Sequence, residues 1–161
     1  MGEKLTGRPV RRIPWIFALL SPLILIAACA AEPELTTVQE SKIVGAWSEG
    51  SGTQITFRAD RTFDASKLNI GSRLYDGCPS GAASGSWAFF VDEGEPGGSV
   101  FASEEATSGE SLVLTFQEVP QGDCVITLNA VDGGKALCAS DDPDFSCPLN
   151  IKFTKIKGVK N

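Results

Sequence analysis

The chain has 161 residues, 42% of them hydrophobic, and a formal net charge of −6 at pH 7. A chain of this length is enough for one domain with a single core. The acidic balance excludes a surface built to bind nucleic acid, because phosphates need a basic patch. The sequence contains no histidine, so the usual pairs of nucleophile and base cannot be assembled. We therefore expect a non-catalytic protein without a cofactor.

Residues 1–28 have the features of a secretory signal. Four basic residues precede an apolar run over residues 13–28, which is shorter than the roughly 20 apolar residues of a membrane-spanning helix. Export followed by cleavage fits this pattern better than a permanent span. The pair Arg11-Arg12 also suggests the twin-arginine route, but Pro14 and Trp15 depart from its usual continuation. The general secretory route is therefore favoured.

The segment Leu25-Ile26-Ala27-Ala28-Cys29 resembles a bacterial lipobox. This resemblance implies that residues 1–28 are removed and that Cys29 becomes the lipidated first residue of the mature chain. The mature chain would carry 10 basic and 19 acidic residues, a net charge near −9. Its acyl chains would then supply the membrane attachment. We expect a lipid-anchored protein on the extracytoplasmic face of a cell membrane.

Residues 29–41 continue from Cys29 as a polar stretch without apolar periodicity. We expect the lipidated cysteine to be followed here by a flexible tether. Beyond it, residues 42–161 form the folded domain.

Alternation of apolar and polar residues predicts an all-β domain. The sequence 54–59 alternates, Asp60-Arg61 makes a turn, and 62–65 alternates back, which indicates a β-hairpin. Further strands are predicted at Ile43–Ser48, Ser86–Val91, Ser99–Ser103, Ser111–Gln117, Cys124–Ala130, Lys135–Ala139 and Asn150–Lys157. Eight or nine short strands in meander order indicate an antiparallel up-and-down β-barrel, with a β-sandwich as the alternative.

The same alternation assigns the inward face of the barrel. The residues that should point inward are Ile55, Phe57, Trp87, Phe89, Leu112, Leu114, Phe116, Ile126, Leu128, Ile151 and Phe153. The segment Asn69–Gly85, which contains Tyr75 and Cys78, is predicted to be the largest loop and a lid over one end. Loops of that length are uncommon unless they are functional or pinned.

Four cysteines follow Cys29, namely Cys78, Cys124, Cys138 and Cys147. An even number in an exported chain predicts two disulfides. Three connectivities are possible. The short, turn-rich segment between Cys138 and Cys147 favours that pair, which leaves Cys78 with Cys124. No metal site is expected, because the chain lacks histidine and any close Cys-x-x-Cys pair.

Two acidic clusters could offer oxygen ligands to calcium, but neither has the spacing of a calcium loop. They are Asp92, Glu93 and Glu95, and Asp141, Asp142 and Asp144. Asp and Pro143 are ordinary turn formers. We read both clusters as turns.

The segment Gly45-Ala46-Trp47, the hairpin over residues 55–63 and a final strand with a basic residue resemble the lipocalin-like barrels of small bacterial envelope lipoproteins. The resemblance covers residues 42–157. It implies that Trp47 on the first strand packs under a basic side chain from the last strand and closes the base of the barrel. Lys155 would take that position, as a cation over an indole.

Two functions remain open after this reading. The large aromatic residues assigned inward would fill a barrel of eight strands, which favours a filled barrel that contacts another envelope protein. The alternative is a carrier that holds a small apolar ligand in the barrel, as the lipocalin resemblance implies. Nucleic acid is not an expected partner.

Overall fold

The structure is a computed structural model that describes residues 32–70, 77–92, 99–120, 122–141 and 145–158. Its strands are β1 (Val38–Gln39), β2 (Gly45–Ser48), β3 (Gln54–Phe57), β4 (Thr62–Leu68), β5 (Gly81–Asp92), β6 (Val100–Ser103), β7 (Ser108–Gly109), β8 (Ser111–Phe116), β9 (Val125–Val131), β10 (Ala136–Ser140) and β11 (Lys152–Lys155). Two short helical turns, α1 (Glu40–Ile43) and η1 (Asp132–Gly134), complete the described elements. The predicted signal over residues 1–28 and the cysteine that follows it, Cys29, lie outside the described residues.

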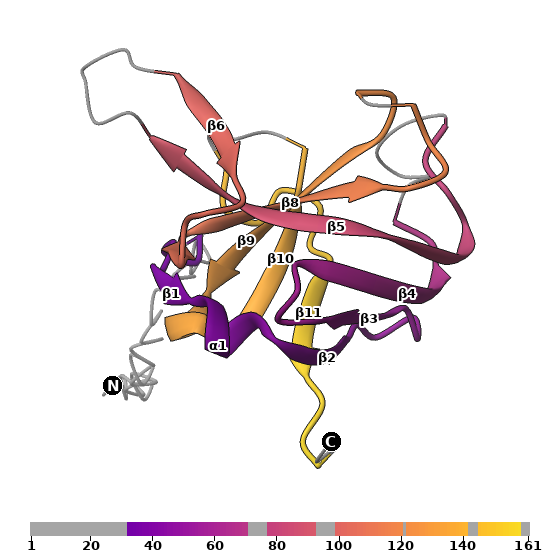
Figure 1. Ribbon diagram of the computed structural model, residues 1–161. Coiled ribbons are helices and arrows are strands. Elements are labelled where there is room, and N and C mark those ends of the chain that lie inside the picture. Colours follow the sequence, from indigo (N-terminus) through magenta and orange to yellow (C-terminus); the bar gives the residue numbers. More distant parts are fainter. Residues whose placement is uncertain (1–31, 71–76, 93–98, 121, 142–144, 159–161) are drawn as a thin grey trace, which may run out of the picture. The chain divides into compact units, whose positions relative to one another are not determined.

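Eight strands form a closed antiparallel barrel (Figure 1). The order around the barrel is β2, β3, β4, β5, β8, β9, β10 and β11, so consecutive barrel strands are neighbours, and β11 pairs back to β2. β6 extends the sheet beyond β5 as one additional strand. The predicted up-and-down barrel is confirmed, and the sandwich alternative does not occur because the sheet closes on itself.

The inward face follows the predicted alternation. All eleven residues assigned inward are at most 5% exposed, and Trp47 and Phe63 join them at 1% and 0%. Successive side chains in a strand point to opposite faces, so a regular alternation is enough to assign the core. Each large apolar side chain buried here contributes about 1.5–3 kcal/mol to folding.

The barrel interior is filled by aromatic rings in edge-to-face contact. The ring centroids of Phe57 and Trp87 lie 5.8 Å apart, those of Trp87 and Phe89 lie 5.6 Å apart, and those of Phe63 and Phe116 lie 5.4 Å apart. This geometry matches the quadrupoles of the rings. A ring that bordered a void large enough for water would count as partly exposed, but these five rings are at most 3% exposed. Within the described residues, four of these rings are thus enclosed by protein atoms, and Phe116 also borders a surface hollow.

The segment predicted as a loop over Asn69–Gly85 differs in its second half, because β5 begins at Gly81. The start of this strand is rich in Gly, Ala and Ser and lacks the alternation of apolar and polar residues on which strand prediction depends. The sequence therefore shows no sign of it. Gly85 itself faces β4 and β8 at once. A Cβ atom at Gly85 would lie 2.0 Å from the carbonyl oxygen of Thr115. Only glycine allows this close approach of the two strands.

The N-terminal stretch predicted as a tether is partly docked onto the barrel. β1 pairs with β7, the amide of Thr36 donates to the carbonyl of Ala130 at 2.8 Å, and Leu35 forms a bridge with Val131. Val38 is 6% exposed. The sequence shows no periodicity here because a single buried side chain and pairing to distant residues hold the segment. From Glu32 onward, the stretch predicted as a flexible tether is therefore held against the barrel.

Both predicted disulfides are present. Cys78–Cys124 joins the segment before β5 to the start of β9, with Cα atoms 5.0 Å apart. Cys138–Cys147 links β10 to the loop that follows it, with Cα atoms 5.3 Å apart. This second bridge lies on the outer face of the barrel. There Cys138 packs with Val131 in a small cluster separate from the main core.

The two disulfides should contribute unequally to stability. In the chain-entropy description, closing 46 residues stabilises by about 4 kcal/mol and closing 9 by about 2.6 kcal/mol. The double variant C78A/C124A should therefore lose more free energy of unfolding in urea than C138A/C147A. The opposite order would show that packing around Cys138, and not loop closure, dominates the shorter bridge.

Candidate functional site

Gly45, Trp47 and Lys155 meet at one end of the barrel, as the resemblance implied. Lys155 is the cross-strand partner of Trp47, and its Nζ atom lies 5.5 Å from the centroid of the Trp47 ring. The same Nζ donates a hydrogen bond to the carbonyl of Lys42 at 2.7 Å. Trp47 donates from Nε1 to the carbonyl of Ile43 at 2.7 Å. The indole and the ammonium therefore join the first and last barrel strands to α1.

Gly45 is required at this closure for two reasons. Its φ of 129° lies in a region that L side chains rarely adopt. A Cβ atom there would also lie 2.9 Å from Cε of Lys155. The glycine thus leaves the space through which the lysine stem passes to reach the ring of Trp47.

The electrostatics of Lys155 limit what this contact contributes. Partial burial, and then the nearby ammonium of Lys42, lower the pKa of Lys155. A lowered lysine pKa means that the protonated group is less favourable in the folded chain than in the unfolded chain. The penalty is present below the folded pKa and disappears as the pH rises through the unfolded value. Desolvation therefore offsets part of the attraction between the ammonium and the indole.

A second basic residue, Arg61, makes a closer contact that the sequence did not reveal. Its Cζ atom lies 4.3 Å from the centroid of the Trp87 ring and 5.4 Å from that of Phe89. Its Nη2 pairs with a carboxylate oxygen of Glu40 at 3.0 Å and donates to the carbonyl of Ala106 at 2.6 Å. The Arg61 side chain is only 15% exposed. A guanidinium is planar and can stack on aromatic rings while its N–H groups donate to oxygens, so it is well suited to such a mostly buried site.

The turn between β3 and β4 orients the side chain of Arg61 toward Trp87. Asp60 accepts hydrogen bonds from the amide of Thr62 at 3.0 Å and from its hydroxyl at 2.6 Å, and these bonds lower the pKa of Asp60. Arg61 adopts a φ of 68°. Trp87 then donates to this turn twice, from its amide to the carbonyl of Arg61 and from Nε1 to the carbonyl of Arg58.

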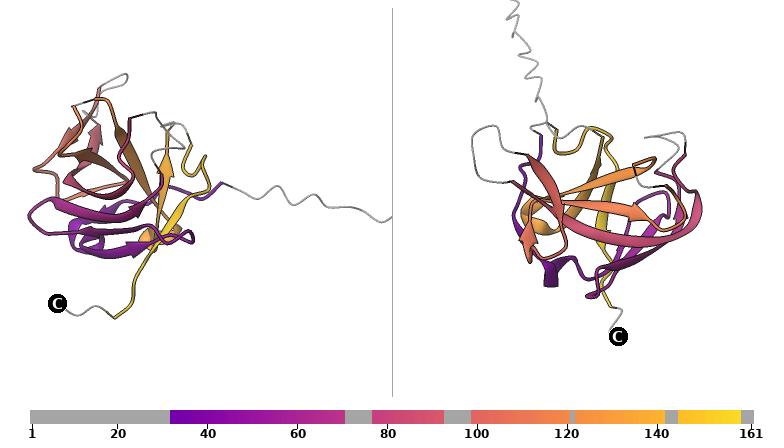
Figure 2. Two further views of the ribbon diagram at one scale, coloured as in Figure 1. Left: turned by 90° about the vertical axis from the view of Figure 1, so that its right-hand side faces the viewer. Right: turned by 45° about the horizontal axis from the view of Figure 1, so that its top comes forward.

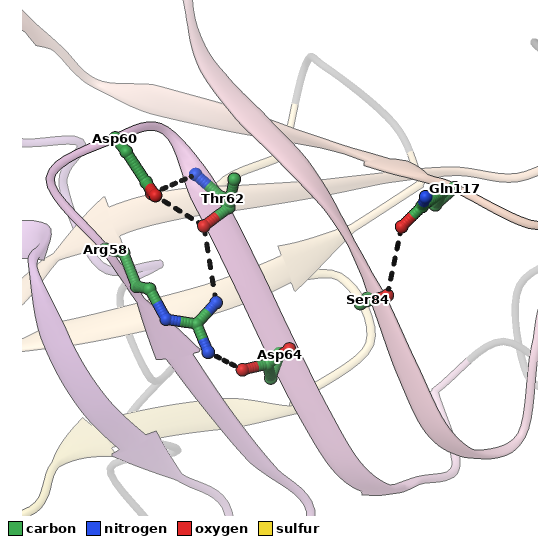
Figure 3. A network of polar contacts seen from close by, with 6 residues as sticks. All are labelled: Arg58, Asp60, Thr62, Asp64, Ser84 and Gln117. Carbon is green, nitrogen blue, oxygen red and sulfur yellow. Dashed lines mark hydrogen bonds and ion pairs between the residues drawn. The ribbon is translucent and has the colours of Figure 1, made fainter.

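The other arginine of the turn serves as a natural comparison. Figure 3 shows Arg58 on the outside of the barrel, where it pairs with Asp64 and donates to the hydroxyl of Thr62. Its side chain is 45% exposed and that of Asp64 is 52% exposed. Arg58 and Arg61 therefore start from the same turn and end in opposite surroundings, one in water and one against the rings of the core.

Arg61 also fixes the N-terminal segment to the barrel. Glu40, its ion-pair partner, is the first residue of α1, and Ala106 belongs to the connection between β6 and β7. One guanidinium thus holds three parts of the chain that are far apart in sequence. Beside it a hollow of 470 Å³ is lined by residues that include Glu40, Val44 and Thr107. We assign Arg61 a structural role, because the groups that its Nη2 contacts all belong to the chain itself. Its buried Nη1 has no hydrogen-bond partner among the described residues.

Around β6, exposed apolar side chains lie beside a strand edge. β6 stands at the end of the sheet and, among the described residues, pairs only with β5 (Figures 1 and 2). Val100 is 62% exposed and Phe101 is 45% exposed. Two surface hollows of 290 and 350 Å³ flank this hairpin, and Phe90 lines both of them.

Several predicted features lie wholly or partly outside the described residues. Those that cannot be placed are Cys29, Tyr75, Glu93, Glu95, Asp142 and Asp144. In the described parts of the chain, no three His, Cys, Asp or Glu side chains gather where they could hold a metal ion. No helix among the described residues is long and apolar enough to span a membrane.

The fold defines a closed, eight-stranded, antiparallel up-and-down barrel, a class consistent with a lipocalin-like barrel. Comparison with protein-family models, with curated proteins and with solved structures gave no match.

The closure by Trp47 and Lys155 can be tested with a double-mutant cycle. Trp47→Ala should cost about 3–5 kcal/mol, as for other buried aromatic residues, and Lys155→Ala about 0.5–1 kcal/mol. The effect of Lys155→Ala on urea unfolding should shrink when Trp47 is already absent, because the contact no longer exists. Additivity within about 0.3 kcal/mol would mean that the two side chains are not coupled.

The contrast between the two arginines gives a second test. Arg61→Ala should lower the free energy of unfolding by about 2–4 kcal/mol, since it removes a desolvated cation–π contact and charged hydrogen bonds. The matched control Arg58→Ala should cost less than about 1 kcal/mol, because its ion pair is exposed. Alanine is preferred to glycine here, since glycine would also relieve the positive φ. Equal losses for the two variants would contradict the role assigned to Arg61.

Proposed function

We propose that this protein is a membrane-anchored lipoprotein of the extracytoplasmic face, in which a non-catalytic barrel serves as a rigid binding module for an envelope or extracellular protein. The anchor would be Cys29, the lipobox cysteine. The observation that carries the proposal is the filled interior. Phe63, Phe89 and Phe153 are 0% exposed, and the two mature-chain indoles, Trp47 and Trp87, are 1% exposed.

Because the interior is filled by side chains, a partner would have to bind the outer surface of the barrel. Carriage of a small apolar ligand, the other expectation from the sequence, needs a pocket of roughly 300 Å³ or more lined by apolar side chains. The rings that would line it pack against one another instead. This packing supports a contact function over ligand carriage.

The surface best suited to a partner is the β5–β6 hairpin. A strand at the end of a sheet offers unpaired backbone amides and carbonyls, to which an extended segment of another chain can add as a further strand. Val100 and Phe101 give this edge apolar side chains, and hollows beside it can receive side chains of the added segment. The recognition mode would be strand addition.

The acidic residues around β6 indicate which kind of partner would bind this edge. Glu104 and Glu105 follow β6 directly and are exposed, and Glu110 lines the larger hollow. Nucleic acid and anionic lipid would be repelled by such a surface. The partner that fits is an extended protein segment with apolar side chains and with Lys or Arg at its flanks, since opposite charges favour encounter and register.

Photocrosslinking in cells that produce the lipid-anchored chain tests this proposal. A photoreactive residue at position 101 should give a discrete protein adduct, and one at position 66 should give none. Ser66, which is also exposed, is the control on β4. The substitution V100S should weaken the adduct at position 101 several-fold, because it removes an exposed apolar side chain that the added strand would cover, while the thermal midpoint stays unchanged.

Two outcomes would contradict the proposal. Equal adducts at positions 66 and 101 would show that β6 is not a preferred surface. Native mass spectrometry of the purified protein supplies the other check. A non-covalent lipophile that leaves only when the barrel unfolds would establish ligand carriage instead.

A further inference from the structure

The N-terminal segment leaves the barrel at a fixed place on its outer face. A carboxylate oxygen of Glu32 accepts hydrogen bonds from the amides of Ser146 at 2.6 Å and of Cys147 at 3.4 Å. The hydroxyl of Ser146 also donates to the carbonyl of Pro33. Together with the bridge between Leu35 and Val131, these contacts hold the segment from Glu32 onward against the face formed by β9 and the loop after β10.

The distance from this place to the lipid is short. Only Ala30 and Ala31 separate Cys29 from Glu32. Consecutive Cα atoms are 3.8 Å apart, so three steps span at most about 11 Å. A tether that reached Ser41 would have allowed about four times that length. The acyl chains of a lipidated Cys29 would therefore bring the face around Glu32 against the lipid head groups.

Two exposed apolar side chains lie on this face. Phe145 is 49% exposed and Leu35 is 39% exposed. The carbonyl of Phe145 accepts hydrogen bonds from Asn129 at 3.2 Å and from Ser140 at 3.1 Å, and the neighbouring Cys147 is tied to Cys138. The backbone that presents the Phe145 ring is thus held firmly, next to the amide that binds Glu32.

We propose that Phe145 and Leu35 form a membrane-facing patch that contacts the head-group and upper acyl region of the bilayer and fixes the orientation of the barrel. This inference rests on the proposed lipidation of Cys29. Apolar side chains at the interface gain from burial among lipids. Glu34 is exposed nearby, so the patch suits a zwitterionic surface rather than an anionic one. The acyl chains would provide the affinity for the membrane, and the patch would set the orientation of the barrel on it.

Tryptophan quenching by brominated lipid tests the patch. Trp15 lies in the predicted signal, so the mature chain would keep only the buried Trp47 and Trp87 as background. The full chain is produced with its signal and reconstituted in phosphatidylcholine vesicles. The emission added by F145W should fall several-fold when the upper acyl chains carry bromine. The matched control F101W, on a similarly exposed ring of β6, should show no such loss.

A variant with a longer link between Cys29 and Glu32 tests whether the short link brings the patch to the membrane. A ten-residue Gly/Ser insertion between Ala31 and Glu32 should abolish the quenching of F145W while flotation with the vesicles is kept. L35W provides a second reporter if F145W does not fold.

Quenching and flotation separate the membrane-facing patch from the lipid anchor. Vesicles that carry the protein but quench F145W and L35W no more than F101W would overturn the membrane-facing patch. Protein that does not float at all would instead overturn the lipidation of Cys29, and the patch with it.

Discussion

The barrel depends on a closure made of very few residue pairs. β11 meets β2 through Thr154 opposite Ser48 and Lys155 opposite Trp47. This seam closes the eight barrel strands into a ring, with β6 as a strand added outside it, so the aromatic side chains inside lose contact with water. The indole of Trp47 lies on the seam and is bonded to α1. Closure, core burial and docking of the N-terminal segment therefore stabilise one another.

Two cation–indole contacts support this barrel, and they differ in strength for a physical reason. Lys155 holds a compact, strongly hydrated charge 5.5 Å from its ring, and its lowered pKa records the cost of removing water. Arg61 spreads its charge over a plane 4.3 Å from its ring and meets a carboxylate at the same time. Arg61 is consequently the stronger connection between turn, core and N-terminal segment.

The sequence predicted what depends on local pattern. Period-two alternation placed the barrel strands and their inward residues, and the short spacing of Cys138 and Cys147 indicated their pairing. The sequence did not predict Arg61, because Asp60-Arg61 reads as a polar turn and the rings that receive the guanidinium come from β5. It also missed the docking of residues 32–41, most of whose partners lie about 70–115 residues further along the chain. Contacts of that range leave no periodic signal.

In the proposed lipoprotein, the docking of the N-terminal segment would order the events of export. Val38 pairs with Gly109, Leu35 with Val131, and Glu32 with Ser146. A chain that crosses the membrane from its N-terminus cannot make these contacts until almost all of it has emerged. Until then, the segment that follows Cys29 is free of the barrel and accessible to any enzyme that acts there. Folding of the proposed lipoprotein would thus close access to the processing site only after processing has had time to finish.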